Sequence, residues 1–364
     1  MAESLLSPYL HWAKTRQPAA IDLAGSNLLH CDLGDLPGAR DAIELAARND
    51  EGFMPLREAI AAHHGVSPDR VVTATGCSGA NFLAIGAIAR VGDDVLIERP
   101  AYDPLMGACV LLGLNVHRFD RRAERGFTVA AEDVRARLTS RTRAIVLTSP
   151  HNPSGVGLDV DTLEAVGREA ARVGAHVIVD EVYLDGANAC GDAHRTLIPA
   201  ARLEGPFIST NSLTKSYGLA GLRCGWAIAP AAIAERMQRT RDVVDNVCSV
   251  PSERLGTLAF QHLDALTART QRILGGNLER ARAFFSSRPE LRLPAPPSSS
   301  IVFARLGDAA RTPAFVQRLL DEHGVAVAPG HFFESPDHFR ISLAGDPAVL
   351  AEGLRRIGTA LDAE

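Results

Sequence analysis

The sequence has no apolar run that approaches the roughly 18–20 residues a helix needs to cross a bilayer. Its first residues, Met-Ala-Glu-Ser-Leu-Leu-Ser-Pro, lack the basic stretch followed by an apolar stretch that marks a secretion signal. Six cysteines are present, and none belongs to a Cys-x-x-Cys pair. We therefore expect reduced thiols in a cytoplasmic protein.

The sequence also lacks a strong charge of either sign. The net charge is −5 with the two signs interspersed, which does not indicate a nucleic acid or an acidic membrane surface as partner. Of its 364 residues, 46% are hydrophobic and 22% charged, as in ordinary globular proteins with a large core. This length predicts two or three structural units.

Strand and helix patterns alternate between residues 70 and 230. Apolar, β-branched stretches predict strands at Val71–Thr75, Asp94–Glu98, Leu114–Phe119, Ala144–Ser149 and His176–Val179. Helices are predicted at Phe82–Val91, Thr128–Leu138 and Asp161–Val173, and a glycine-bearing turn at Gly76–Asn81. This alternation predicts an α/β domain of three layers with a mostly parallel sheet.

The two ends of the chain have a different pattern. Residues 1–20 read as a partly helical arm, followed by a short strand and turn at Ile21–Asn27. Residues 231–285 read as helical, and a strand–helix–strand region follows from Ile301. We expect an N-terminal arm that is part of a small domain at 1–45, a large domain at 46–260 and a C-terminal small domain at 261–364.

One cationic segment, Ser209–Trp226, combines hydroxyl groups, a lysine, an arginine and three glycines. Such a segment is suited to holding an anion against the backbone. A lysine in a water-poor pocket near a second cation can lose its proton and attack a carbonyl carbon. The alternative for Lys215 is a solvated lysine beside a turn, which is the common situation for lysines.

Three further sites lie at the ends of predicted strands. The turn at Gly76–Asn81 precedes a helix and can bind an anion through backbone N–H groups, although it lacks the spacing of a dinucleotide fingerprint or a P-loop. Prolines and a glycine around Asn152 fix a rigid loop where ligands of parallel sheets bind. Asp180 ends a buried strand, where a carboxylate costs free energy unless a cation lies beside it. The alternative is an aspartate that caps a turn at the end of the strand.

The stretch Ser-Leu-Thr-Lys-Ser-Tyr-Gly-Leu-Ala-Gly-Leu-Arg-Cys-Gly resembles the lysine motif of the class I/II aminotransferases, which are fold-type I enzymes that use pyridoxal 5'-phosphate (PLP). Asn-Pro-Ser-Gly, Asp-Glu-Val-Tyr and Arg-Ile-Ser match further motifs of this family in the right order. The resemblance implies that Lys215 forms the Schiff base with PLP and moves the proton. Asp180 would face the pyridine nitrogen, and Tyr183 would bind the phenolic oxygen and complete the catalytic set.

The resemblance also assigns the remaining contacts. It implies that the cofactor is bound by Cys77, Ser78, Tyr102, Asn152, Asp180, Tyr183, Ser212, Lys215 and Arg223. In the same way it implies that the substrate is bound by Gly25, Asn152 and Arg340, with the arginine on the α-carboxylate. One position departs from the family: Ala47 stands where a tyrosine usually reaches the partner subunit, and Arg48 beside it is a candidate substitute.

The fold implied is a fold-type I PLP-dependent transferase, with a large three-layer αβα domain and a smaller α+β domain, assembled as a homodimer. The activity implied is transfer of an amino group between an L-amino acid and a 2-oxo acid, with no metal, nucleic acid or membrane involved. Two alternatives stay open. One is another PLP reaction on amino acids, such as C–S β-elimination; the other is a PLP-binding regulator without turnover.

Overall fold

The computed structural model describes residues 6–191 and 197–363. Its larger sheet has the strand order β2-β8-β7-β6-β5-β3-β4. These strands are β2 (Val71–Thr75), β3 (Asp94–Arg99), β4 (Asn115–Asp120), β5 (Thr142–Thr148), β6 (His176–Asp180), β7 (Phe207–Ser212) and β8 (Cys224–Ile228). Strand β8 runs antiparallel to both β2 and β7, and the other neighbours are parallel. The predicted mostly parallel sheet is thus confirmed.

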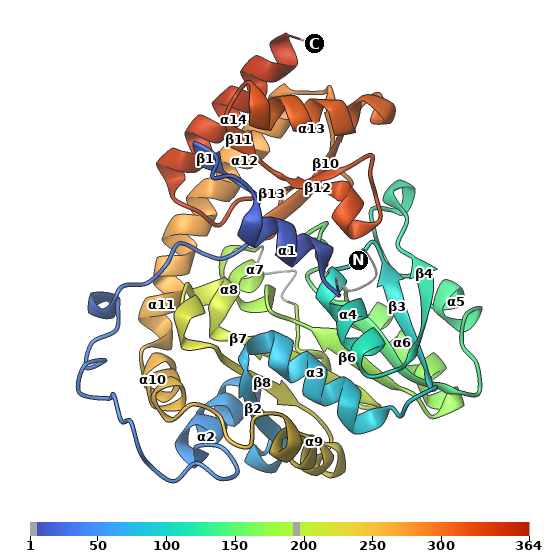
Figure 1. Ribbon diagram of the computed structural model, residues 1–364, viewed down its shortest axis with the longest axis vertical. Helices are drawn as coiled ribbons and strands as arrows, with labels where there is room; N and C mark the ends of the chain where they lie inside the picture. Colours follow the sequence, from blue (N-terminus) through green and yellow to red (C-terminus); the bar gives the residue numbers. More distant parts are fainter. Residues whose placement is uncertain (1–5, 192–196, 364) are drawn as a thin grey trace.

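Side chains of successive residues in each strand point to opposite faces of this sheet. In β5, Ala144 and Val146 join the apolar cluster with α3 (Gly76–Ile88), α4 (Asp103–Leu111) and α9 (Ala231–Val244). Ile145 and Leu147 join the cluster on the other face, with α5 (Ala131–Arg135) and α6 (Val160–Val173). The result is the three-layer arrangement visible in Figure 1, in which each fully buried aliphatic side chain contributes about 1.5–3 kcal/mol.

The edge of the sheet formed by β2 and β8 is covered by further helices. Trp226 is buried there among residues of α2 (Met54–His64), α8 (Leu213–Tyr217) and α10 (Val250–Gln261). Helix α7 (Leu184–Cys190) follows β6. No helix in residues 6–191 and 197–363 is long and apolar enough to cross a membrane.

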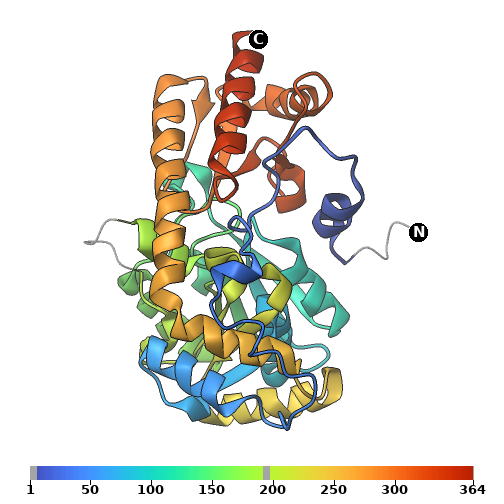
Figure 2. The ribbon, with the colours of Figure 1, turned by 90° about the vertical axis from the view of Figure 1, so that its left-hand side faces the viewer.

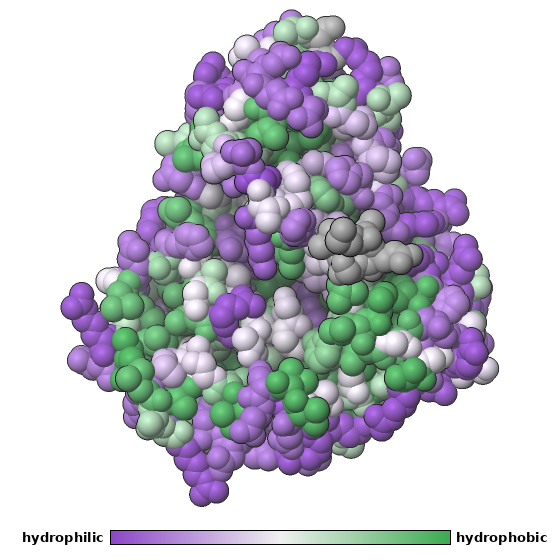
Figure 3. Space-filling view, in the orientation of Figure 1, coloured by the Kyte–Doolittle hydropathy of each residue, from purple (hydrophilic) through white to green (hydrophobic). Residues whose placement is uncertain are grey.

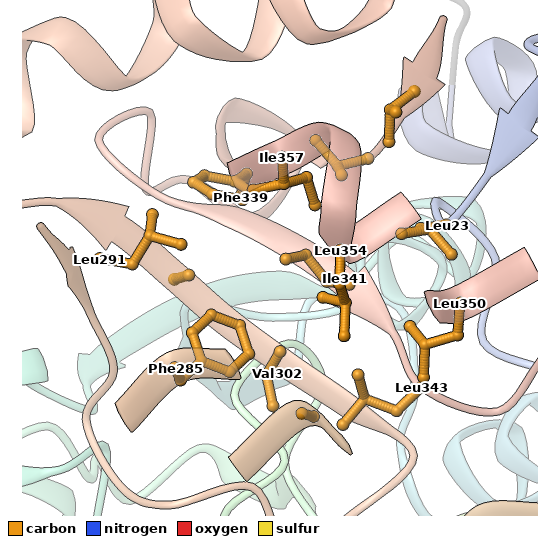
Figure 4. Packing of buried hydrophobic residues seen from close by; sticks show 14 of the residues in the cluster. Leu23, Phe285, Leu291, Val302, Phe339, Ile341, Leu343, Leu350, Leu354 and Ile357 are labelled. Atoms are coloured by element: carbon orange, nitrogen blue, oxygen red, sulfur yellow. The ribbon is translucent and has the colours of Figure 1, made fainter. Parts of the chain in front are cut away.

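A second, smaller body is built around an antiparallel sheet in the order β12-β13-β10-β9. Its strands are β9 (Leu291–Arg292), β10 (Ile301–Leu306), β12 (Ala328–Pro329) and β13 (Phe339–Ser342), and its helices are α13 (Thr312–Asp321) and α14 (Pro347–Asp362). Figure 4 shows Phe339, Ile341, Leu354 and Ile357 packed together in its core. The N-terminal strand β1 (Ile21–Asp22) pairs with β11 (Val325–Ala326), so both ends of the chain meet in this body.

One long helical run connects the two bodies, as Figure 2 shows in orange. It consists of α11 (Leu263–Thr270), a π-helical turn (Gln271–Gly275) and α12 (Gly276–Ser287). Thr270 Oγ1 donates to the carbonyl oxygen of Ser216 at 2.7 Å, and Asn277 Nδ2 donates to that of Leu343 at 2.8 Å. The run therefore contacts both α8 (Leu213–Tyr217), which contains Lys215, and the residue that follows β13, the strand that contains Arg340.

The first helix, α1 (Pro8–Thr15), is attached to the large body by one carboxylate. Asp103 accepts hydrogen bonds from the backbone N of Tyr9 at 2.8 Å and from Ser7 Oγ at 3.0 Å. The expected N-terminal arm is thus docked beside α4, with Tyr9 buried.

Two predicted elements differ from the structure. Helix α3 begins at Gly76 rather than after a turn at Gly76–Asn81, because the reversal from β2 is absorbed by Gly76 itself, at φ 72°. The helix predicted at Thr128–Leu138 covers only Ala131–Arg135. Thr128 Oγ1 instead donates to the carbonyl oxygen of Arg125, a local bond that competes with helix formation.

Candidate active site

Lys215 lies in a short helix that strand β7 places over the end of the sheet. Ser212 caps α8 by accepting from the backbone N of Thr214 at 3.4 Å, and Gly218 ends it in the left-handed conformation. The Lys215 amine donates to Ser26 Oγ at 2.8 Å and to Asn27 Oδ1 at 2.6 Å. Burial and, to a smaller extent, the neighbouring Arg340 lower the pKa of this amine to about 7, while Asp180 opposes the shift. A large part of the Lys215 amine is therefore unprotonated and nucleophilic near neutral pH.

Asp180 is buried at the carboxyl end of β6. It accepts from Asn81 Nδ2 at 2.7 Å and from the backbone N of Val182 at 3.2 Å. Burial raises the pKa of this carboxyl group, and the hydrogen bonds from Asn81 and Val182 counter the rise. No salt bridge of Asp180 occurs among the described residues, so its negative charge is not paired with a cationic side chain there.

A line of hydrogen bonds connects three of the predicted residues. Asn152 Nδ2 donates to Tyr183 Oη at 3.4 Å, and Asn152 Oδ1 accepts from Arg340 Nη1 at 2.7 Å. Arg340 is fully buried, and its Nη2 donates to the carbonyl oxygens of Ala24 at 2.9 Å and Gly25 at 3.3 Å. Burial raises the pKa of Tyr183 to about 12, which keeps its hydroxyl protonated.

Arg340 keeps one hydrogen-bond donor unused. Its Nε is buried and has no partner among the described residues. Since an unsatisfied buried donor is costly, this guanidinium group is suited to an acceptor that a ligand supplies. Arginine binds a carboxylate through two parallel hydrogen bonds, and Nε is one of the donors for that geometry.

The start of α3 meets the segment that follows the lysine. Gly225 pairs in register with Ser212, and a Cβ on Gly225 would lie 2.3 Å from the backbone of Gly76. A Cβ on Gly76 would lie 2.4 Å from Arg223 Nη2. The first turn of a 13-residue helix, with its free N–H groups, therefore lies beside a guanidinium group, which together suit an anion.

Two predicted residues of this helix start have different surroundings. Ser78 is exposed and makes no side-chain hydrogen bond among the described residues. The Cys77 thiol is buried, donates toward Thr210 Oγ1 at 3.6 Å, and has its pKa raised well above the usual value by burial. The thiol is thus neutral and faces the neighbourhood of Asp180 rather than solvent.

Tyr102 lies directly before α4, at the edge of the same space. Its ring is 6.2 Å from that of Tyr9 in a T-shaped arrangement. Burial raises the pKa of its hydroxyl, with contributions from Tyr183 and Tyr9. These neighbours place Tyr102 beside the line of hydrogen bonds that leads to Arg340.

Several residues of the site carry no sequence motif. Tyr9 donates to the carbonyl oxygen of Ala24 at 3.0 Å, and its hydroxyl accepts from Arg340 Nη2. Asn81 holds Asp180, and its Oδ1 accepts from Thr210 Oγ1 at 2.6 Å. Tyr9 lies in a helix far from any motif, so nothing in the sequence marks it. The signal for Asn81 is an asparagine inside a largely apolar helix.

His151 lies in the loop after β5 and is fully buried. Its Nε2 is 3.0 Å from the carbonyl oxygen of Pro100, which can only accept, so Nε2 carries the proton. Its Nδ1 then accepts from Ser154 Oγ at 2.7 Å. Burial lowers the pKa of His151 well below its usual value. A neutral histidine thus fixes the loop that presents Asn152.

The site combines an amine of lowered pKa, a carboxylate without a cation, an amide–phenol pair and an anion-binding helix start. These groups fit PLP, whose aldehyde, ring nitrogen, phenolic oxygen and phosphate need those partners in turn. Within residues 6–191 and 197–363, no three His, Cys, Asp or Glu side chains gather as a metal site would require.

Comparison with known proteins also indicates a PLP-dependent enzyme. Residues 49–357 match the family described as aminotransferase class I and II. The chain is 31% identical to a capreomycidine synthase from Streptomyces vinaceus, over 98% of this chain and 93% of the relative. It is 30% identical to an arginine–pyruvate transaminase from Pseudomonas aeruginosa, over 84% of this chain and 80% of the relative.

A solved structure has the same fold along its whole length. The PLP-dependent aminotransferase from Streptococcus suis superposes with a TM-score of 0.90 at 25% identity, covering 98% of this chain and 97% of that one. The family match spans more than half of the sequence. The chain therefore belongs to the aminotransferase class I and II family, and its cofactor is pyridoxal 5'-phosphate.

Proposed function

We propose that this member of the aminotransferase class I and II family moves an amino group between an L-amino acid and a 2-oxo acid. The observation that carries the proposal is Lys215, whose buried amine has a pKa lowered to about 7 beside the unpaired carboxylate of Asp180. An amine that is unprotonated near neutral pH is what a lysine needs to bind an aldehyde and to move protons.

Each predicted cofactor-binding residue is assigned to one part of PLP: the ring nitrogen, the phenolic oxygen, the ring face or the phosphate. PLP, when bound, supplies a cationic ring that accepts electrons from the substrate's α-carbon. Asp180 would keep the ring nitrogen protonated, and Lys215 would move the proton to and from the α-carbon. Asn152 and Tyr183 would hold the phenolic oxygen, and Tyr102 would lie against the ring. Ser212, Arg223 and the helix start at Cys77 and Ser78 would hold the phosphate.

The substrate is held on the opposite side of the site. Arg340 would bind the α-carboxylate through Nε, which has no partner in the part of the chain that the structure describes, together with a terminal nitrogen. Asn152 and the backbone of Gly25 complete this side, since both already contact the guanidinium group. Pinning the carboxylate fixes the rotation of the α-carbon, so that the bond to be broken faces Lys215.

A second candidate is another PLP reaction on an amino acid that does not transaminate. The similarity to a capreomycidine synthase over 98% of this chain favours it, because that relative is not named as a transaminase. C–S β-elimination belongs to the same class of alternatives. A regulator without turnover is a weaker candidate, since the catalytic lysine and its lowered pKa are retained.

A substrate screen separates these functions. The purified enzyme is incubated with single amino acids, with and without a 2-oxo acid, and the products are identified by mass spectrometry. Transamination predicts a new 2-oxo acid only when the acceptor is present. Pyruvate and ammonia from cystathionine, or a cyclic product without any acceptor, would instead establish the second candidate. The Lys215→Ala variant should lose about 10⁴-fold in rate, and a near-normal rate would reject the function.

We also propose a cytoplasmic homodimer, although Ala47 removes the tyrosine that family members use between subunits. All six cysteines are free, as a reducing compartment favours. Large apolar side chains are exposed at Leu45, just before the large body, and within it at Val91, Val110, Leu111 and Val243. Figure 3 shows apolar patches on the face of the large body that this view presents. Light scattering tests the dimer, and an active monomer would exclude it.

A further inference from the structure

The nitrogen of Lys215 is held by two side chains that belong to no motif of the lysine segment. Ser26 Oγ lies 2.8 Å and Asn27 Oδ1 lies 2.6 Å from Lys215 Nζ. Both follow strand β1, almost 190 positions before the lysine. The two contacts are therefore a tertiary feature of this chain, formed where its N-terminal segment crosses over α8.

The backbone fixes these two side chains in place. The N–H of Leu28 donates to the carbonyl oxygen of Lys215 itself at 3.2 Å, and that of Leu29 donates to Ala344 at 2.8 Å. Leu28 is buried in the core of the small body, and Ser26 is only 7% exposed. The segment cannot swing away from the lysine without breaking these contacts.

The donor and acceptor roles at this place follow from chemistry. An ammonium group only donates, so the amide of Asn27 must present its oxygen, and Ser26 must accept through its lone pairs. The proton of the Ser26 hydroxyl is then free to point to Tyr183, and a hydrogen bond from Ser26 is one of the influences that lower the pKa of that phenol. Ser26 thus connects Lys215 with Tyr183.

We propose that Ser26 and Asn27 are catalytic residues that hold the nitrogen of Lys215 whenever it is not bound to the cofactor. This role presupposes that Lys215 binds PLP, as proposed above. When the amine of a substrate takes the place of the lysine, the released nitrogen of Lys215 needs hydrogen-bond acceptors inside a water-poor site. Ser26 and Asn27 supply two acceptors and keep the nitrogen within reach of the position it left.

The pair also sets how much of the free lysine is protonated. Three other charged groups influence its charge: Arg340 from β13 and Arg223 before β8 disfavour the ammonium form, while Asp180 from β6 favours it. The nearby Cys77 thiol from α3 is neutral, because burial raises its pKa well above the usual value. Hydrogen bonds to the charged form favour that form. Removing an acceptor should therefore lower the pKa of the free lysine, and adding a negative charge in its place should raise it.

The chain offers an unusually clean test, because Lys14 and Lys215 are its only two lysines. The full-length protein, stripped of cofactor, is exposed to a trace of acetic anhydride at a series of pH values. Mass spectrometry of the two lysine peptides then gives the labelling of Lys215 relative to exposed Lys14. The anhydride reacts only with the unprotonated amine, so the midpoint of this ratio reports the titration of Lys215. The rate at which added PLP restores visible absorbance gives the midpoint by a second route.

Wild-type protein should show a midpoint at about pH 7. Asn27→Asp should raise it by about 1–3 units, as a carboxylate within hydrogen-bonding distance does. Ser26→Ala should lower it by about 0.5–1 unit, Ser26→Thr should restore it, and Ser287→Ala on the surface should leave it unchanged. An unchanged midpoint in Asn27→Asp would overturn the proposal, and that variant decides alone if Ser26→Ala fails to fold.

These outcomes are separate from the proposed reaction. The labelling experiment uses no substrate. Its midpoints therefore do not depend on whether the enzyme catalyses transamination or another PLP reaction. Conversely, a protein that gives the expected midpoints but binds no PLP would reject the proposed function and not the contact of Lys215 with Ser26 and Asn27.

Discussion

The two sides of the candidate site are held together in different ways. On the cofactor side, Asp180 in β6 pairs in register with Thr210 in the neighbouring strand β7. Lys215 comes five residues after Thr210, in the helix α8 that directly follows β7. On the substrate side, Arg340 comes from the small sheet and binds Tyr9 and Ala24, which are 331 and 316 positions away in the sequence. The first side is one rigid sheet edge, and the second forms only when three distant segments meet.

This difference predicts two kinds of variant. Changes on the cofactor side should affect every amino-acid substrate alike, because they act on the ring. Changes on the substrate side should depend on whether the substrate has a carboxylate, because they act through Arg340. They should also be sensitive to how the N-terminal segment is docked, since parts of a protein with few local contacts open most easily.

Among variants that keep Lys215, the largest effect is expected for Asp180→Asn. Loss of one partner of a buried ion pair costs about 3–5 kcal/mol, so the rate should fall by roughly 10²–10³·⁵-fold for amino acids and simple amines alike. Asp161→Asn, on the exposed face of α6, is the matched control. A fall of less than about tenfold, roughly 1.4 kcal/mol, would show that Asp180 is not the partner of the ring nitrogen.

The next effect concerns stability and isolates Lys215 in the cofactor-free protein. Its pKa in the folded state, about 7, lies below the usual 10.5, so the unfolded chain binds more protons between these values. The lysine therefore destabilises the fold below pH 7, and this effect fades as the pH rises toward 10.5. At 1.36 kcal/mol per unit, Lys215→Met should be more stable by about 3–5 kcal/mol near pH 6.

Urea unfolding at pH 6, 8 and 10 measures this difference, with Lys14→Met as the control. The gap between Lys215→Met and wild type should narrow steadily with rising pH, by up to about 3–5 kcal/mol in total. A gap that is independent of pH would mean that folding does not lower the pKa of the Lys215 amine.

The same contrast explains what the sequence could predict. Asp180 and Asn152 each follow an apolar β-branched strand, so both their position at the sheet edge and their chemistry can be read from local pattern. The parallel sheet was predictable for the same reason. The domain boundaries near residues 45 and 260 stay predictions, because a long helical run joins the two bodies without a linker.

The substrate side was much less predictable. Tyr9 lies in a short helix whose pattern shows nothing of its contact with Arg340, because that contact depends on tertiary structure alone. The neutral His151 was missed because burial, which the sequence does not reveal, decides its role. The start of α3 was predicted six residues late, since one glycine at φ 72° replaces a whole turn.

On the substrate side, Arg340→Lys should have the larger effect. The planar guanidinium fixes both position and rotation of a carboxylate, whereas an ammonium group fixes position only. Loss of one charge-assisted hydrogen bond should cost about 1.5–3 kcal/mol, raising KM and lowering kcat together. The measurement is the kcat/KM ratio of an amino acid to its decarboxylated amine. If this ratio is the same in wild type and variant, Arg340 does not bind the carboxylate.

The smallest effect is expected for Tyr9→Phe. The ring remains, so its packing against Trp12, Phe332 and Phe333 is kept. Only the hydroxyl is lost, which accepts from Arg340 and donates to Ala24 at 3.0 Å. The carbonyl oxygen of Ala24 is not left without a donor, because Arg340 still reaches it at 2.9 Å. One net hydrogen bond of about 0.5–1.5 kcal/mol predicts a two- to tenfold rise in KM for amino acids, with kcat little changed.

A control separates the hydroxyl from the docking of α1. Ser7→Ala removes one of the two bonds to Asp103 at 3.0 Å but leaves the Tyr9 hydroxyl in place. If Tyr9 acts by orienting Arg340, the combined Tyr9→Phe and Arg340→Lys variant should lose less than the sum of the single losses, since both act through one contact. Ser7→Ala should instead add fully to Arg340→Lys. Full additivity for Tyr9→Phe would place its role in the docking of the helix alone, and the substrate side would then depend on Arg340 and the backbone of Ala24 and Gly25.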